Sequence, residues 1–161
     1  MSEREPRDRH DERSNASPSV PALVPELLVG DRSTSLAFWC DLCGFRIDYE
    51  RPEEGFAYLT LGSAHIMIEQ AGIGRNWITG PLERPLGRGI NVQIGVRSLD
   101  PIVVALERAD HALFMAPETT WYRVGPGTDA GVRQFLVTDP DGYLIRFQES
   151  LGRRTAVDGG V

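Results

Sequence analysis

The order of predicted secondary structure repeats once along this chain, and the repeat constrains the fold more than any other sequence feature. Each half has a strand-like segment, an amphipathic helix and then further strand-like segments, over about 50 to 60 residues. One supersecondary unit used twice predicts an α+β protein made of two βαβββ modules.

The first module begins with the apolar residues 22–29, which predict a strand. Asp31 or Ser33 can cap the helix that follows, and Gly44 stands where a helix commonly ends. The apolar residues between them recur with helical spacing. Three more strands are predicted at residues 45–50, 56–61 and 64–70.

The second module begins with a predicted strand at residues 90–96 and a helix at residues 99–109, which has Pro101 in its first turn. Pro-Asp-Gly at residues 140–142 is a strong turn signal before the last strand. Four segments of the second half have strand character: residues 113–116, 120–124, 133–138 and 143–149.

The segments outside the modules are rich in charge, glycine or proline. Residues 1–19 carry dense charge of both signs, so we predict a disordered tail. Residues 71–89 contain glycines and prolines throughout and predict a long linker or lid loop. The predicted organisation is a tail at residues 1–19, a first module at 20–70, the loop at 71–89, a second module at 90–151 and a tail at 152–161.

Charge and composition exclude several classes of protein. A net charge of −6 argues against a nucleic-acid partner. No apolar run approaches the ~20 residues that a membrane helix needs, and residues 1–19 lack the apolar segment of a secretory signal. We therefore expect a cytoplasmic protein with no membrane partner. Cys40 and Cys43 lie near the end of the predicted helix, which favours packing roles over zinc or redox chemistry.

Two motifs identify a resemblance to a known family. The first helix carries Leu36-Ala37-Phe38-Trp39 followed by Gly44-Phe45, and the last turn reads Asp139-Pro140-Asp141-Gly142-Tyr143. Together with the repeat, they resemble the vicinal oxygen chelate superfamily, which includes glyoxalase I, extradiol dioxygenases, fosfomycin-resistance enzymes and bleomycin-resistance proteins. The resemblance covers residues 22–150. It implies curved mixed sheets around a cleft, and a homodimer, often with modules exchanged between chains.

In the metal-dependent members of this family, His or Glu ligands project into the cleft from four strand positions. The resemblance assigns these positions to Val24, Met67, Asn91 and Arg146. None of the four is a good ligand for a divalent cation, and a guanidinium would repel one. We therefore expect no metal cofactor and no catalytic residues. This pattern is similar to the bleomycin-resistance branch, whose members sequester a drug without metal catalysis.

Side chains two residues apart on a strand lie on the same face of the sheet. The neighbours of the four assigned positions at this spacing therefore define a candidate binding face. The resulting ligand-binding face is unusually polar and predicts a wet cleft for a cationic or polar ligand. An alternative is that Arg146 simply pairs with Glu26 or Glu69, because buried charges need partners. The predicted members of the face are Glu26, His65, Met67, Glu69, Asn91, Gln93, Arg146 and Gln148.

Aromatic residues in loops and strands extend the candidate site. Trp77 lies in the glycine-rich loop, and Trp121 and Tyr122 form a second cluster with polar neighbours. Aromatic rings beside a cleft can stack on flat ligands, and the alternative is that they pack the loops onto the sheet. Trp39 lies on the apolar stripe of the first helix and is predicted to belong to the core.

These features favour a protein that sequesters a cationic, partly aromatic small molecule in an acidic and aromatic cleft. The alternative is an enzyme, either a glyoxalase-like lyase or isomerase or a dioxygenase, with a displaced metal site at Glu26, His65 and Glu69. On one strand, His65 and Glu69 lie about 13 Å apart, so these two cannot share a metal ion directly. A third interpretation is a scaffold that binds a metabolite for regulation.

Overall fold

The computed structural model describes residues 21–156, so the predicted tail at residues 1–19 lies outside the described part of the chain. Two four-stranded mixed sheets, with strand orders β1-β4-β3-β2 and β5-β8-β7-β6, confirm the predicted α+β fold of two βαβββ modules. In each sheet, the first strand of the module pairs in parallel with the last, and the other pairs are antiparallel. None of the helices in residues 21–156 is long and apolar enough to cross a membrane.

The elements of the first module follow the predicted order. The helix α1 (Arg32–Leu36) continues as a π-helical segment over Ala37–Leu42. The Asp31 carboxylate accepts a hydrogen bond from the Thr34 backbone N–H at 2.7 Å, which confirms Asp31 as the helix cap. The strands are β1 (Glu26–Val29), β2 (Arg46–Arg51), β3 (Phe56–Leu61) and β4 (Ala64–Gln70), with a short 3-10 turn over Pro52–Glu54.

The second module differs from the prediction in the lengths of its strands. Its elements are β5 (Asn91–Val96), α2 (Asp100–Arg108), β6 (Leu113–Gly125), β7 (Thr128–Thr138) and β8 (Leu144–Thr155). The segments predicted as separate strands at 113–116 and 120–124 form one strand, because a register shift between Met115 and Glu118 accommodates Pro117 without ending it. Strand β8 runs past residue 151 and pairs with β7, so residues 152–155 of the predicted tail belong to the sheet.

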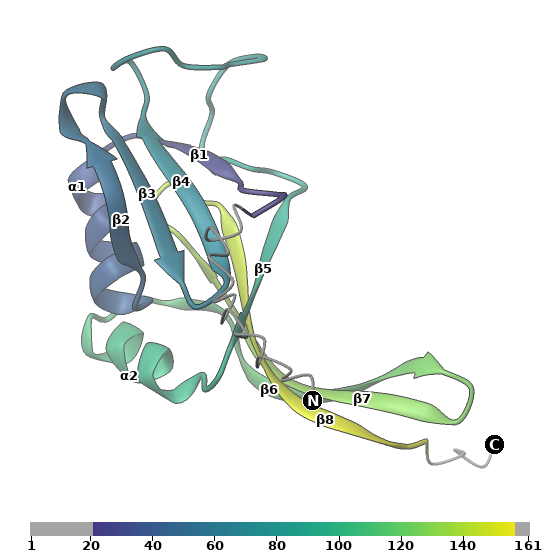
Figure 1. Ribbon diagram of the computed structural model, residues 1–161. Helices are drawn as coiled ribbons and strands as arrows, with labels where there is room; N and C mark the ends of the chain where they lie inside the picture. The colour runs from purple at the N-terminus through teal and green to yellow at the C-terminus, as the bar shows by residue number, and fades with distance from the viewer. Residues whose placement is uncertain (1–20, 157–161) are drawn as a thin grey trace, which may run out of the picture.

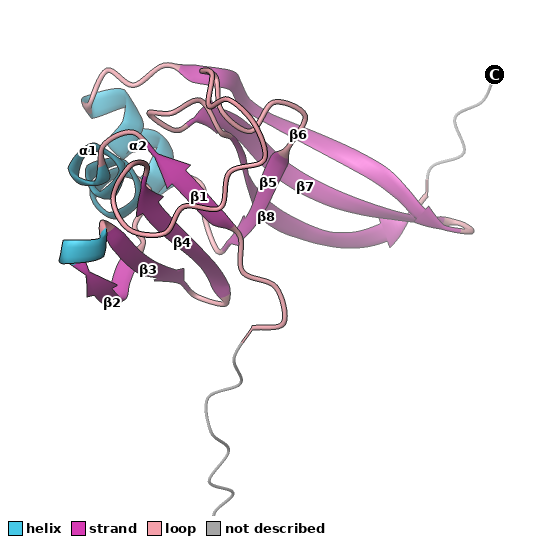
Figure 2. Ribbon diagram, turned by 90° about the horizontal axis from the view of Figure 1, so that it is seen from above, coloured by secondary structure: helices cyan, strands magenta, loops and turns pink. Residues whose placement is uncertain are grey.

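One face of each sheet packs against the helices and forms the core. Figures 1 and 2 show α1 and α2 close together, with the outer part of the second sheet extending away from the first module. Trp39 is fully buried, and the rings of Phe38 and Phe45 pack edge-on against it, which confirms its core role. Burial raises the pKa of the Cys43 thiol, and also that of Cys40, so both cysteines act in packing.

The Asp-Pro-Asp-Gly-Tyr turn joins the two modules, and we call its contacts the inter-module junction. The buried Asp141 carboxylate accepts hydrogen bonds from the Gly30 backbone N–H at 3.0 Å and from Arg84 Nη2 at 2.6 Å. The Tyr143 hydroxyl donates to the Leu28 carbonyl oxygen of β1 at 3.1 Å. A Cβ on Gly87 would lie 2.4 Å from the Tyr143 ring, so this close approach of the loop requires glycine. The junction therefore holds β1, the loop and β8 in fixed relative positions.

Candidate ligand-binding site

The open face of the first sheet carries a hollow of about 300 Å³, which we call the acidic-aromatic pocket. Strands β1 and β4 supply two carboxylates, strands β2 and β3 supply aromatic rings, and the loop supplies an arginine and a tryptophan. Three glutamates and two arginines give this lining a net negative charge. The lining residues are Glu26, Tyr49, Arg51, Glu54, Phe56, Met67, Glu69, Arg75 and Trp77.

A carboxyl pair lies at the centre of this pocket. Glu69 is only 8% exposed, and its carboxylate accepts a hydrogen bond from Asn76 Nδ2 at 3.1 Å, which ties the loop to β4. Desolvation raises the pKa of Glu26, and a hydrogen bond to Glu69 and the negative charge of Glu69 raise it further. A carboxyl whose ionisation is disfavoured by a neighbouring carboxylate is a favourable place for a cationic group.

Aromatic rings form the wall beside this pair. The Tyr49 ring stacks on Tyr58 at a centroid distance of 4.9 Å and lies 5.8 Å from Phe56. Two rings already carry cations: the Arg51 guanidinium lies 3.9 Å over the Phe56 ring, and that of Arg75 lies 4.5 Å over Trp77. The wall therefore has the geometry for cation–π contacts with a ligand.

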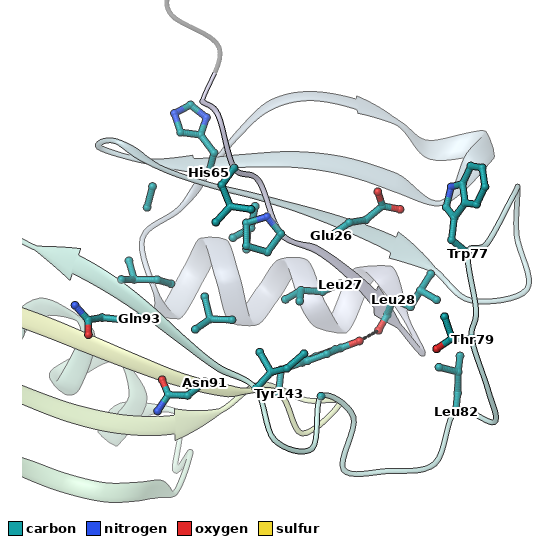
Figure 3. A pocket seen from close by; sticks show the side chains of 18 of the residues that line it. Glu26, Leu27, Leu28, His65, Trp77, Thr79, Leu82, Asn91, Gln93 and Tyr143 are labelled. Atoms are coloured by element: carbon teal, nitrogen blue, oxygen red, sulfur yellow. Dashed lines mark hydrogen bonds between the residues drawn. The ribbon is translucent and has the colours of Figure 1, made fainter.

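A second, larger hollow of about 860 Å³ lies between the modules, where the edge strands β1 and β5 face each other, and we call it the seam pocket. Most of its lining is apolar. Glu26 and His65 lie on the side of the first module, whereas Asn91 and Gln93 lie on the side of the second (Figure 3). Glu26 and Trp77 line both pockets, so the two hollows adjoin.

The eight predicted strand residues lie on the faces of the two sheets that do not pack against the helices. The structure divides them among three places: the acidic-aromatic pocket, the seam pocket and the open face of the second sheet. Glu26, Met67 and Glu69 line the acidic-aromatic pocket together with Trp77. His65, Asn91 and Gln93 line the seam pocket, and the Tyr58 hydroxyl lies 3.2 Å from Nδ1 of His65. Arg146 and Gln148 lie on the open face of the second sheet, paired in register with Gln93 and Gly95 of β5.

Trp121 and Tyr122 are not part of either hollow. The Trp121 ring covers Gly131, where a Cβ would lie 2.6 Å from it, and the Arg154 guanidinium stacks on it at 3.8 Å. The Tyr122 hydroxyl accepts a hydrogen bond from Gln134 Nε2 at 3.0 Å on the opposite face of the sheet. Adjacent strand residues point to opposite faces, so these two rings cannot form one stacking cluster, and packing accounts for Trp121.

Arg146 does not pair with Glu26 or Glu69. Its Nη2 donates a hydrogen bond to the Gln93 side-chain oxygen, and it forms no ion pair with a carboxylate within residues 21–156. The predicted pairing is wrong because strand alternation predicts only on which face of its sheet a side chain lies. Arg146 belongs to the second sheet and the two glutamates to the first, and the distance between the sheets depends on how the modules pack.

The aromatic residues of β2 and β3 were missed by the sequence-based prediction. Phe56 and Tyr58 are both buried and stand opposite Glu69 and Met67 in the β3–β4 register. Their i, i+2 spacing was a signal that they share a face. The spacing shows only that the two rings share a face. The register between β3 and β4 is needed to show that this face is the one that carries Met67 and Glu69.

Comparison with known proteins supports the same family. No protein-family model matches the chain, and no curated protein is significantly similar to it. A glyoxalase/bleomycin resistance protein/dioxygenase superfamily member from Vibrio splendidus 12B01 is 37% identical in sequence, over 78% of this chain and 95% of that chain, with a TM-score of 0.37.

Two more distant structures share the fold. TioX from Micromonospora sp. ML1 is 21% identical over 80% of this chain and 98% of its own, with a TM-score of 0.60. A glyoxalase/bleomycin resistance protein/dioxygenase from Alicyclobacillus acidocaldarius is 12% identical over 80% of this chain and 90% of its own, with a TM-score of 0.53. By its fold and by its sequence identity to the Vibrio protein, the chain belongs to the glyoxalase/bleomycin resistance protein/dioxygenase superfamily.

The donor set of the described residues does not fit the metal that enzymes of this family use. The positions that the resemblance assigns to metal ligands hold Val24, Met67, Asn91 and Arg146, which supply no carboxylate or imidazole. Within residues 21–156, no three His, Cys, Asp or Glu side chains lie close enough together to hold a metal ion. The displaced site predicted at Glu26, His65 and Glu69 is therefore not assembled.

Proposed function

We propose that this protein binds and sequesters a cationic, partly aromatic small molecule, in the manner of bleomycin-resistance proteins and without a metal ion. The observation that carries the proposal is that Glu26 and Glu69 line one hollow beside a wall of aromatic rings. A ligand cation can lie beside the two carboxyls, while its flat part stacks on the exposed ring of Trp77.

The chemistry of the side chains around the site supports binding over turnover. The two cysteine thiols have raised pKa values and lie in the helix-packed core region, away from the open face. The imidazole of His65 contacts the Tyr58 hydroxyl rather than either glutamate of the pair. No observation on the described residues favours the enzymatic alternative.

Calorimetric titration with bleomycin tests the proposal directly, at micromolar protein. We expect Glu69→Gln to weaken binding about 10- to 100-fold, because a charge-assisted contact contributes roughly 1.5–3 kcal/mol. Glu53→Gln, an exposed change in the 3-10 turn outside both pockets, is the matched control and should bind like the wild type. No heat of binding, or equal affinities for both variants, would contradict a role for the carboxyl pair.

The same titration has an optical readout in Trp77, which is 70% exposed in the free protein. A ligand that covers this ring should shift its fluorescence to shorter wavelength. Trp77→Phe should abolish the shift, since Trp39 is fully buried and Trp121 is covered by Arg154. A Trp77→Ala protein with full affinity would show that the ring is not part of the site.

We also propose a homodimer, which is typical of the family. The outer part of the second sheet supports it, because Val124 and Leu151 are large apolar residues with 51% and 41% of their surfaces exposed. Sedimentation equilibrium should give twice the mass of the chain, and Val124→Ser with Leu151→Ser should shift the protein towards the monomer. A wild-type monomer at high micromolar concentration would refute the dimer.

A further inference from the structure

The seam pocket is larger and more apolar than the acidic-aromatic pocket, and the proposed function leaves it without a role. We propose that it binds an extended apolar part of the ligand, so that the ligand is a cationic amphiphile. The cationic head lies at Glu26 and Glu69, and the apolar part lies between β1 and β5. The placement of the head rests on the proposed function, whereas that of the apolar part rests on the seam pocket alone.

The size and preformed walls of the seam pocket support an organic occupant. A volume of about 860 Å³ falls in the range of small-molecule sites, which are mostly apolar with a few polar groups. Tyr143 lines this pocket, and its hydroxyl is hydrogen-bonded to the Leu28 carbonyl oxygen across the seam (Figure 3). The inter-module junction therefore holds both walls in place before a ligand binds.

Exposed apolar side chains surround the mouth of the seam pocket. Ile90 precedes β5 and is 59% exposed, and the loop contributes Trp77 at 70%, Ile78 at 49% and Leu82 at 44%. Large apolar residues gathered at the rim of a hollow mark a binding site more often than scattered ones do. Covering them with an apolar ligand would remove this surface from water.

The two pockets adjoin, and this proximity decides the class of ligand. Glu26 and Trp77 belong to both linings, so an apolar group in the seam pocket ends next to the carboxyl pair. A neutral or anionic head would leave the net negative charge of the acidic-aromatic lining unbalanced.

A series of alkyltrimethylammonium ions with tails of one to ten carbons, kept below micelle-forming concentrations, tests the inference by calorimetry. Affinity should rise about 3- to 4-fold for each added methylene group until the pocket is filled, because burying one methylene contributes about 0.8 kcal/mol. Decyl sulfate, which has the same tail and an anionic head, should bind at least about 10-fold more weakly than decyltrimethylammonium.

Two surface variants separate the tail from the head. Ile78→Ser combined with Ile90→Ser should reduce the dependence on tail length and leave tetramethylammonium binding unchanged. Val104→Ser removes a comparably exposed apolar residue from α2, outside the seam pocket, and should change neither. Glu69→Gln should weaken every ammonium ion by the same factor.

The outcomes distinguish the inference from the proposed function. Equal affinities for tetramethylammonium and decyltrimethylammonium would overturn the inference and leave the carboxyl-pair site intact. Equal affinities for decyl sulfate and decyltrimethylammonium would overturn the cationic head, and with it the proposed function. Loss of a dimer in the Ile78→Ser, Ile90→Ser protein without any probe would show that the seam is a subunit interface, which overturns the inference.

Discussion

Replacing Asp139 by Asn is expected to stabilise the protein relative to the wild type by about 2 kcal/mol more at pH 7.5 than at pH 4.5. Asp139 is 3% exposed, and burial raises the pKa of its carboxyl from 3.8 to about 6. The hydrogen bonds that its oxygen accepts from the backbone lower this pKa, but burial has the larger effect. Its other oxygen, Oδ2, is buried and has no hydrogen-bond partner within the described structure.

The sign follows from the direction of the pKa change at Asp139. The folded state binds more protons than the unfolded state between the unfolded pKa of 3.8 and the folded pKa of about 6. The stability that the protonated acid contributes is therefore fully present below this window and is lost as the pH rises through it. An Asn side chain stays neutral and keeps an oxygen for the Asp141 and Tyr143 backbone N–H groups, at 3.0 and 2.9 Å.

Urea unfolding of both proteins between pH 4.5 and pH 7.5 measures this effect. Other carboxyl groups titrate in the same range, but their contributions cancel in the difference between the two proteins. The slope of the unfolding free energy with urea should be the same for both, which shows that the same surface is exposed on unfolding. A stability difference that stays constant across the pH range would show that Asp139 has no raised pKa in the folded protein.

Replacing Asp141 by Ala is expected to lower the free energy of unfolding by about 2–4 kcal/mol. The Asp141 carboxylate is only 2% exposed and accepts hydrogen bonds from the Gly30 N–H and from Arg84, which lie in different parts of the chain. Its removal leaves the Gly30 N–H without its acceptor and releases the loop from the last turn. The junction that holds β1 beside the second module then loses its central group.

Arg84→Ala is the matched control, because it removes the other member of the same ion pair. The Arg84 side chain is 63% exposed, and without it the Asp141 carboxylate keeps its hydrogen bond from the Gly30 N–H, so the loss of Arg84 should cost less than the loss of Asp141. Urea unfolding of the two variants at neutral pH compares them. An equal decrease in the free energy of unfolding for the two variants would show that the ion pair with Arg84, rather than the hydrogen bond from the Gly30 N–H, accounts for the role of Asp141.

Elements that depend on local signals were predicted correctly. The bounds of β3 and β4 match because Gly55 and the Gly62-Ser63 pair mark turns, and alternation marks the strands between them. Asp31 and Gly44 bracket the first helix in the structure as they do in the sequence. Each of these features is decided by residues within a few positions of one another.

Strand lengths in the second sheet could not be read in the same way. Residues 117–119 of β6 and 152–155 of β8 have no clear strand signal of their own, yet they pair with β7. A partner strand that supplies hydrogen bonds can extend a strand beyond its own propensity. Their strand conformation therefore comes from pairing with β7 and not from signals within these residues.

For the candidate site, the sequence by itself determined the two-module fold and the open face on which each polar strand residue lies, because alternation is a local property of a strand. Only the tertiary structure decided which of these residues meet. It brought Trp77 beside Glu26, joined Glu69 to the loop through Asn76, and left Arg146 with Gln93 on the other sheet. These contacts depend on strand register, on the path of the loop and on the junction at Asp141, which are set by packing between residues far apart in the chain.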